Sequence, residues 1–174
     1  FINIPKNTEI LITTHPYEKL FMIYTLRRIK SIENKFKDIY NYKNNSIQRN
    51  FFLVNGVPIV NGSFSQNSFI LNHLLKNTVT NYLNLSKGKI LDLYCGSGNL
   101  TINLPSSKFE VVGIDIDPFA IEYAKKYSPY DYRVGDELTM KEVISSAKWD
   151  AIILDPPREG AKNLMNTLKN ANTS

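Results

Sequence analysis

The stretch that decides the fold is Ile90-Leu91-Asp92-Leu93-Tyr94-Cys95-Gly96-Ser97-Gly98-Asn99. Its first half is an apolar run of strand length, and its second half holds two glycines separated by one residue. Glycine lets a backbone turn sharply and approach a ligand where any side chain would collide. The stretch therefore predicts a buried strand that leads into a ligand-binding turn and then into a helix.

Strand and helix patterns alternate on the C-terminal side of this stretch. Apolar runs of strand length lie at 89–93, 111–115, 132–134 and 151–154, and helical patterns begin near Asn99, Pro118 and Glu137. Such alternation is typical of a parallel sheet with helices on its faces. We therefore predict an α/β fold, with a Rossmann-like sheet over residues 63–174 preceded by a small α+β segment over residues 1–62.

Length and composition narrow the class of protein. A chain of 174 residues suits about one domain, and 43% hydrophobic with 21% charged residues is ordinary globular composition. No apolar run is long enough for a membrane span, and the start does not resemble a signal peptide. The single cysteine, Cys95, excludes an internal disulfide and a cysteine-based zinc site, so we expect no metal and a reducing, cytoplasmic setting. Because the first residue is Phe1, we expect a part of a longer chain.

Three residues near the glycine turn distinguish between two kinds of cofactor. Asp115 ends the following strand, 17 residues beyond Gly98, where a carboxylate can accept both hydroxyls of a ribose. A dinucleotide fingerprint needs a third glycine, but Thr101 stands there. Asp92 would repel a pyrophosphate, whereas it suits the ammonium and sulfonium groups of S-adenosylmethionine. We expect that cofactor; the alternative is a plain Rossmann-like sheet with an incidental pair of glycines.

Two further acidic residues follow strands of the same predicted sheet. Asp136 comes after the third strand, where it either accepts a hydrogen bond from an adenine amino group or caps the next helix. Asp155-Pro156-Pro157-Arg158 follows the fourth strand, at the edge where open α/β sheets bind ligands. Methyltransferases that act on amide or amine nitrogens usually show Asn-Pro-Pro-aromatic at this place, so Asp and Arg indicate a different chemistry.

The excess of positive charge lies in the first third of the chain. Residues 1–62 hold nine Lys and Arg against four Asp and Glu, whereas residues 63–174 are balanced. RNA, a polyanion, is a natural partner for this segment, and the alternative is a solvated basic face.

The pattern of residues 1–62 predicts a strand, a helix and a hairpin. Residues 9–14 resemble a strand, and His15-Pro16 opens a helix that should run to about Ile32. A basic cluster lies near the end of this predicted helix and consists of Arg27, Arg28 and Lys30. These cations either balance the helix dipole or contact RNA. Asn55-Gly56 between two apolar runs predicts a β-hairpin over 51–60.

The segment that joins the hairpin to the first strand of the large sheet predicts another helix, over 68–83. His73 falls within this helix without a second metal ligand nearby, so we expect it to be structural or exposed.

Two motifs together with a third are specific to one family. The stretch from Ile90 to Asn99, combined with Asp155-Pro156-Pro157-Arg158-Glu159-Gly160, resembles the RNA uracil-5 methyltransferase family of tRNA and ribosomal RNA. Gly62-Ser63-Phe64-Ser65-Gln66 is similar to that family's Phe-Phe-Gln-x-Asn motif. The resemblance covers roughly residues 50–165. It implies an enzyme that transfers methyl from S-adenosylmethionine to carbon 5 of a uracil, after flipping the base out of tRNA or rRNA.

The resemblance also implies roles for single residues. Beside Asp92, Gly96 and Gly98 of the turn, it assigns cofactor contacts to Gln66, Tyr94, Asn99, Asp115, Asp136 and Asp155. Asp155 would also lie near the target base. Two departures stand out: Asn67-Ser68 follows Gln66 where x-Asn is expected, and Pro105 should end the helix after the glycine turn early.

The family's nucleophile is a cysteine thiolate that adds to carbon 6 of uracil, after which a base removes the carbon-5 proton. That cysteine lies a strand beyond the Asp-Pro-Pro-Arg loop, so we expect it C-terminal to residue 174 and expect this chain alone to be inactive. Cys95 suits packing instead, and the apolar run 151–154 should form an exposed sheet edge. Two alternatives remain open: an RNA methyltransferase for another base, and a non-catalytic cofactor-fold or RNA-binding module.

Overall fold

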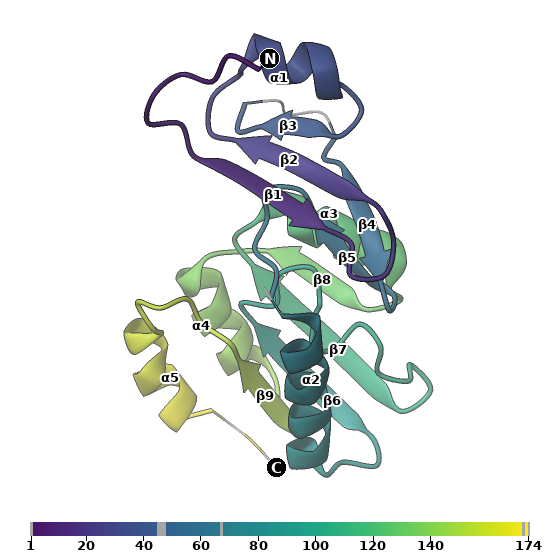
Figure 1. Ribbon diagram of the computed structural model, residues 1–174. Helices are drawn as coiled ribbons and strands as arrows, with labels where there is room; N and C mark the ends of the chain where they lie inside the picture. Colours follow the sequence, from purple (N-terminus) through teal and green to yellow (C-terminus); the bar gives the residue numbers. More distant parts are fainter. Residues whose placement is uncertain (1, 45–47, 67, 172, 174) are drawn as a thin grey trace.

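The computed structural model of the chain describes residues 2–44, 48–66, 68–171 and 173 (Figure 1). The largest sheet in this part of the chain has the strand order β8-β7-β6-β9, formed by β6 (Gly88–Leu93), β7 (Phe109–Asp115), β8 (Asp131–Val134) and β9 (Ala151–Leu154). Its neighbouring strands all pair in parallel. The predicted strands and the α/β class are confirmed.

Apolar side chains alternate between the two faces of this sheet and build a core on each. Ile90 and Val111 contribute to one core, whereas Leu91 and Ile114 contribute to the other. All four are fully or almost fully buried. Successive side chains of a strand point to opposite faces, so a strand buried on both faces is mostly apolar, and Asp92 is the buried exception in β6.

Helices cover both faces, as the alternation predicts. Helix α3 (Pro118–Tyr127) packs into the first core through Ile121, and α4 (Glu137–Ser146) packs into the second through Ile144. The second face also carries the 3-10 turn η1 (Lys162–Leu164) and helix α5 (Met165–Lys169). The helix predicted over 68–83 is confirmed as α2 (Phe69–Leu83), capped by the hydroxyl of Ser68, with His73 exposed.

The helix predicted to start near Asn99 is wrong. Residues 98–104 form consecutive turns, in which the N–H of Ile102 donates to the carbonyl of Gly98 at 2.8 Å. Pro105 follows at once, and because proline has no N–H it prevents a second helical turn. Pro105 was expected to shorten this helix, and in the structure it prevents the helix from forming.

The first segment also differs from its prediction. Strands β1 (Ile10–Thr14) and β2 (Phe21–Thr25) pair antiparallel, β3 (Tyr40–Tyr42) pairs in parallel with β2, and α1 spans only Lys30–Phe36.

The helix predicted from His15 to Ile32 is therefore wrong, and burial gives the reason. Met22 and Ile23 are 3% and 5% exposed and belong to two different cores. Adjacent side chains reach opposite sides in a strand, whereas one face of a helix cannot bury both in this way.

The hairpin predicted at Asn55-Gly56 is confirmed as β4 (Phe51–Val54) and β5 (Val57–Val60). The turn residues have φ angles of 50° and 79°, which a two-residue hairpin turn of type I′ requires. Pro58 is tolerated because, in the described chain, β5 pairs only with β4 and its other side is an edge.

The hairpin connects the first segment to the large sheet (Figure 1). Its residues Val57 and Ile59 share a core with Met22 of β2 and with Ile102, which follows the glycine turn. This core crosses the boundary expected between residues 62 and 63, so the two predicted units pack as neighbours around one apolar cluster.

Strand β9 lies at one edge of the large sheet, where it pairs with β6 alone among the described strands. Ile153 is 7% exposed, and the other three residues of β9 are half-buried. A parallel bridge between Trp149 and Thr173 lies just before this edge. Of the helices described, none has the length and apolar character needed to cross a membrane.

Candidate functional site

A cavity of about 660 Å³ opens at the carboxyl ends of β6, β7 and β9, between the glycine turn, the hairpin and α2. Open α/β sheets bind ligands at this edge, and the volume is in the range of cofactor sites. The predicted site residues that line it are Gln66, Asp92, Tyr94, Gly96, Asn99, Asp115 and Asp155. Gly98 and Asp136 are the two predicted residues outside this lining.

The glycine turn combines three left-handed residues: Tyr94, Gly96 and Gly98 have φ angles of 59°, 54° and 79°. A Cβ at Gly98 would lie 2.6 Å from the hydroxyl oxygen of Tyr132, so packing requires glycine there. A Cβ at Gly96 would meet nothing within 4 Å. Gly96 thus leaves its backbone open to a ligand, whereas Gly98 lets the turn pack on the sheet.

Asp115 holds the turn in place from the end of the neighbouring strand. Its Oδ2 accepts a hydrogen bond from the N–H of Gly96 at 2.8 Å, and its Oδ1 accepts one from the N–H of Asp117 at 2.9 Å. Each carboxylate oxygen can accept more than one hydrogen bond. The carboxylate therefore remains able to accept hydroxyl donors from a ligand in the cavity.

Asp92 is a buried carboxylate at the floor of the cavity, 1% exposed. Its Oδ2 accepts a hydrogen bond from the hydroxyl of Thr101 at 2.6 Å, while its Oδ1 is buried without a hydrogen-bond partner among the described residues. Burial, and the nearby carboxylates of Asp155 and Asp115, raise the pKa of Asp92 to about 7. A buried acceptor without a partner is costly, so a cationic or hydrogen-bonding ligand would stabilise this group.

Thr101 and Tyr132 support Asp92 in a way that the sequence did not predict. The hydroxyls of these two residues lie 3.0 Å apart, and both side chains are fully buried. In the sequence, Thr101 stands out only because it breaks the dinucleotide fingerprint. In the fold it orients the carboxylate that faces the cavity.

Cys95 lies in the same turn, where its thiol is buried. It is 6% exposed and packs within the core on the first face of the sheet. Burial, followed by the charges of Asp92 and Asp115, raises the pKa of the thiol. A thiol that stays protonated is unreactive, so the packing role expected for Cys95 suits its surroundings.

Asn99 and Asn72 join the glycine turn to helix α2. Their side-chain amides donate to each other at 2.8 Å and 2.9 Å, and both residues line the cavity. Gln66 also lines the cavity, from the segment before α2. Ser68, the position that departs from the family motif, caps α2, because its hydroxyl accepts from the N–H of Leu71 at 3.3 Å. Asn72 carried no signal in the sequence because its role depends on this contact.

Tyr94 and Asp136 have structural partners outside the cavity. The hydroxyl of Tyr94 donates to Glu137 at 2.7 Å, and the other carboxylate oxygen of Glu137 accepts from Asn163 at 2.7 Å. Asp136 is exposed and caps α4, because its Oδ1 accepts from the N–H groups of Leu138 and Thr139. The capping alternative is therefore present, and the adenine contact stays a prediction.

Exposed apolar side chains surround the same end of the sheet. Ile116 follows β7 and is 70% exposed, and Val134 ends β8 and is 52% exposed. Leu138 lies in the first turn of α4 and is 66% exposed. A flat apolar ligand such as a nucleobase would cover such surface.

Asp155 is one of four acidic residues that line the cavity, with Asp92, Asp115 and Asp117. It is exposed and follows β9, and its N–H donates to the carbonyl of Leu93 at 3.4 Å. The loop then closes through a bond from the N–H of Gly160 to the carbonyl of Pro157 at 2.8 Å. The fold and the site together define a Rossmann-like protein with an acidic cavity for a small, positively charged cofactor.

The chain belongs to a methyltransferase family: residues 84–172 match the family described as methyltransferase domain. It is 29% identical over 122 residues to the 23S rRNA (uracil(1939)-C(5))-methyltransferase RlmD of Neisseria lactamica, covering 64% of this chain and 27% of that protein. It is 37% identical over 103 residues to the tRNA (uracil(54)-C(5))-methyltransferase of Pyrococcus horikoshii, covering 58% of this chain and 24% of that protein. The chain thus spans about a quarter of the length of these curated relatives.

Among solved structures, the chain is similar to the Pyrococcus abyssi tRNA (uracil-54, C5)-methyltransferase in complex with S-adenosyl-L-homocysteine. The TM-score is 0.68 at 21% identity, and the match covers 93% of this chain and 46% of that one. At this level of identity the likeness shows the fold, and the match extends over the first segment as well as the large sheet.

Proposed function

We propose that the chain binds S-adenosylmethionine and forms part of an enzyme that methylates carbon 5 of a uracil in tRNA or rRNA. The observation that carries the cofactor assignment is Asp92, whose buried Oδ1 has no hydrogen-bond partner in the described part of the chain and lies near an open glycine turn. The choice of uracil rests on the relatives, which are named as uracil-C5 methyltransferases of 23S rRNA and of tRNA.

The residues of the cavity fit this cofactor, which supplies an electrophilic methyl group from its sulfonium. Asp115 would accept the ribose hydroxyls, and Asp92 would face the ammonium group. The open backbone at Gly96 would leave room for the part of the cofactor that joins its ribose to its ammonium group. Ile116 and Leu138, both exposed, would cover the adenine ring.

Carbon 5 of uracil is unreactive until a nucleophile adds at carbon 6. Cys95 does not serve, because its thiol is buried and its pKa is raised. We propose that the nucleophile lies outside these 174 residues. The part played by this chain is then to bind the methyl donor and, through Asp155 at the mouth of the cavity, to contact the target base.

The basic first segment supports RNA as the substrate. Its nine Lys and Arg against four Asp and Glu give an electrostatic attraction for phosphates, and the hairpin fixes this segment beside the cavity. We therefore propose that residues 1–62 contribute to RNA binding, while the large sheet binds the cofactor.

Equilibrium dialysis of the 174-residue chain against S-adenosylhomocysteine and against NAD tests the cofactor assignment. We expect saturable binding of S-adenosylhomocysteine and none of NAD, because four carboxylates line the cavity and would repel a pyrophosphate. Binding of NAD with equal or higher affinity would overturn the assignment.

A further inference from the structure

The basic cluster of the first segment lies at a different place from the one predicted. Arg27 and Arg28 lie in the turn between β2 and α1, and Lys30 is the first residue of α1. All three therefore lie before or at the N-terminal end of a helix, where the dipole disfavours cations. Balancing a helix dipole, the alternative to RNA contact, is ruled out by the position of the cluster.

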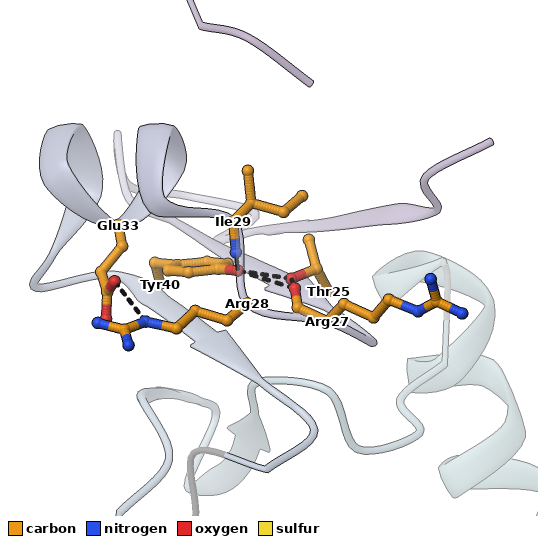
Figure 2. Close-up of polar contacts among 6 residues, drawn as sticks. All are labelled: Thr25, Arg27, Arg28, Ile29, Glu33 and Tyr40. Carbon is orange, nitrogen blue, oxygen red and sulfur yellow. Dashed lines mark hydrogen bonds and ion pairs between the residues drawn. The ribbon is translucent and has the colours of Figure 1, made fainter. Parts of the chain in front are cut away.

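The backbone of this turn is fixed by a buried group of hydroxyls (Figure 2). Thr25 and Tyr40 are 1% and 3% exposed, and their hydroxyl oxygens lie 2.7 Å apart. Thr25 donates to the carbonyl of Arg27 at 2.6 Å, and the oxygen of Tyr40 accepts from the N–H of Ile29 at 2.9 Å. A third bond runs from Tyr40 to the same Arg27 carbonyl at 3.2 Å. The exposed turn is thus attached at both ends to one buried tyrosine.

The two arginines of the turn differ in their partners. The Nε of Arg28 donates to Glu33 at 2.8 Å, so the charge of Arg28 is already balanced. Arg27 has no anionic or aromatic partner within the described chain. Figure 2 shows the two guanidinium groups extending to opposite sides of the turn.

We propose that Arg27 binds an RNA phosphate and that Tyr40 is a positioning residue that holds the turn for this contact. A guanidinium matches phosphate geometry, and a backbone fixed before binding loses less entropy on binding. This inference rests on the proposed function, since RNA is the substrate proposed above.

Filter binding of the 174-residue chain to an unmodified tRNA transcript, over a series of salt concentrations, tests the phosphate contact. We expect Arg27→Gln to weaken binding about tenfold and to lower the slope of log affinity against log salt by about 1. The matched control is Arg28→Gln, which removes the same charge from the same turn and should change the slope much less.

Equal effects of the two substitutions would mean that only overall charge matters, and would overturn the assignment of Arg27. Absence of any tRNA binding by the wild-type chain at low salt would overturn it as well. Binding of S-adenosylhomocysteine, measured on the same preparations, reports separately on the proposed cofactor site, so a failure there is distinguishable.

A double-mutant cycle tests the role of Tyr40. Tyr40→Phe should weaken tRNA binding severalfold in the wild-type background but have little further effect in Arg27→Gln, because Tyr40 acts through Arg27. The control is Tyr42→Phe, at the other tyrosine of β3, and this variant should bind tRNA normally. Additive losses in the double variant, or unchanged binding by Tyr40→Phe, would show that the hydroxyl group of Tyr40 only stabilises the fold.

Discussion

Asp92 illustrates at the scale of one residue how the fold prepares a binding site. Folding removes its carboxylate from water. The Oδ2 atom accepts a hydrogen bond from Thr101, whereas Oδ1 has no hydrogen-bond donor among the described residues. Its pKa rises from the ordinary value of 3.8 to about 7, chiefly because burial penalises the charged form. A group in this state binds a proton or a cation readily, so the protein stores part of its binding free energy there.

The raised pKa of Asp92 predicts how stability depends on pH. The folded chain keeps a proton on Asp92 that the unfolded chain releases, so this group should lower stability as pH rises from about 4 to about 7. Asp92→Asn removes that dependence. The melting temperature of the variant should rise relative to that of wild type as pH increases to neutrality. Parallel curves of melting temperature against pH would contradict the raised pKa.

The same group predicts the pH dependence of cofactor binding. A cationic ligand needs the ionised carboxylate, so affinity for S-adenosylhomocysteine should increase as pH rises through about 7. Calorimetry at several pH values checks this expectation, with Asp92→Asn as the control that should bind weakly at every pH. An affinity that is constant from pH 6 to 8 would argue against contact between Asp92 and the ammonium group.

At the scale of one element, helix α4 shows how Asp136 can have two roles. Its Oδ1 caps the helix, accepting from the backbone of Leu138 and Thr139 at 3.1 Å and 3.0 Å. Its Oδ2 has no partner among the described residues, and hydrogen bonding to the helix start lowers the pKa of the group. The second oxygen is therefore available to an adenine amino group.

Two substitutions separate these roles of Asp136. Asp136→Ser keeps a capping oxygen, so it should retain stability while weakening the binding of S-adenosylhomocysteine. Asp136→Ala should lose both, because alanine has no oxygen to cap the helix. Urea denaturation and calorimetry provide the two measurements. Full affinity in the serine variant would leave Asp136 as a cap alone.

The elements that could be predicted from the sequence are those with a single pattern. β6 and β7 each contain a run of buried apolar residues, and the residues at their ends, Asp115 among them, follow directly from a parallel sheet. The run around Met22 and Ile23 fitted both a helix and a strand, and only its burial between two cores decides for the strand. The roles of Asn72 and Glu137 depend on tertiary contacts, so no pattern marks them.

At the scale of the whole molecule, Arg49 joins the first segment to the large sheet. Its guanidinium lies 4.7 Å from the ring centre of Tyr24 in β2 and 4.3 Å from that of Phe119 in α3. Its Nη1 donates to the carbonyl of Asn61 at 3.0 Å. A Cβ at Gly62 would approach this guanidinium to 2.5 Å, which explains the glycine that follows Asn61.

Removing this junction should destabilise the chain as a unit. Arg49→Ala loses contacts with two aromatic rings, so the free energy of unfolding should fall by about 2 kcal/mol. Arg49→Lys keeps the charge but not the planar stacking, and should recover only part of the loss. Chemical denaturation monitored by tryptophan fluorescence measures both. An unchanged midpoint in Arg49→Ala would mean that the two halves are held together by their apolar core alone.

The proposed function requires the cofactor cavity, and Asp115 is the most specific residue of that cavity. Calorimetry with S-adenosylhomocysteine should show that Asp115→Ala weakens binding by about 1.5–3 kcal/mol, the contribution of hydrogen bonds to a charged acceptor. Asp131→Ala, an exposed acid of equal charge in β8, serves as the control and should bind like wild type. Equal affinity of wild type and Asp115→Ala for S-adenosylhomocysteine would contradict the proposed site.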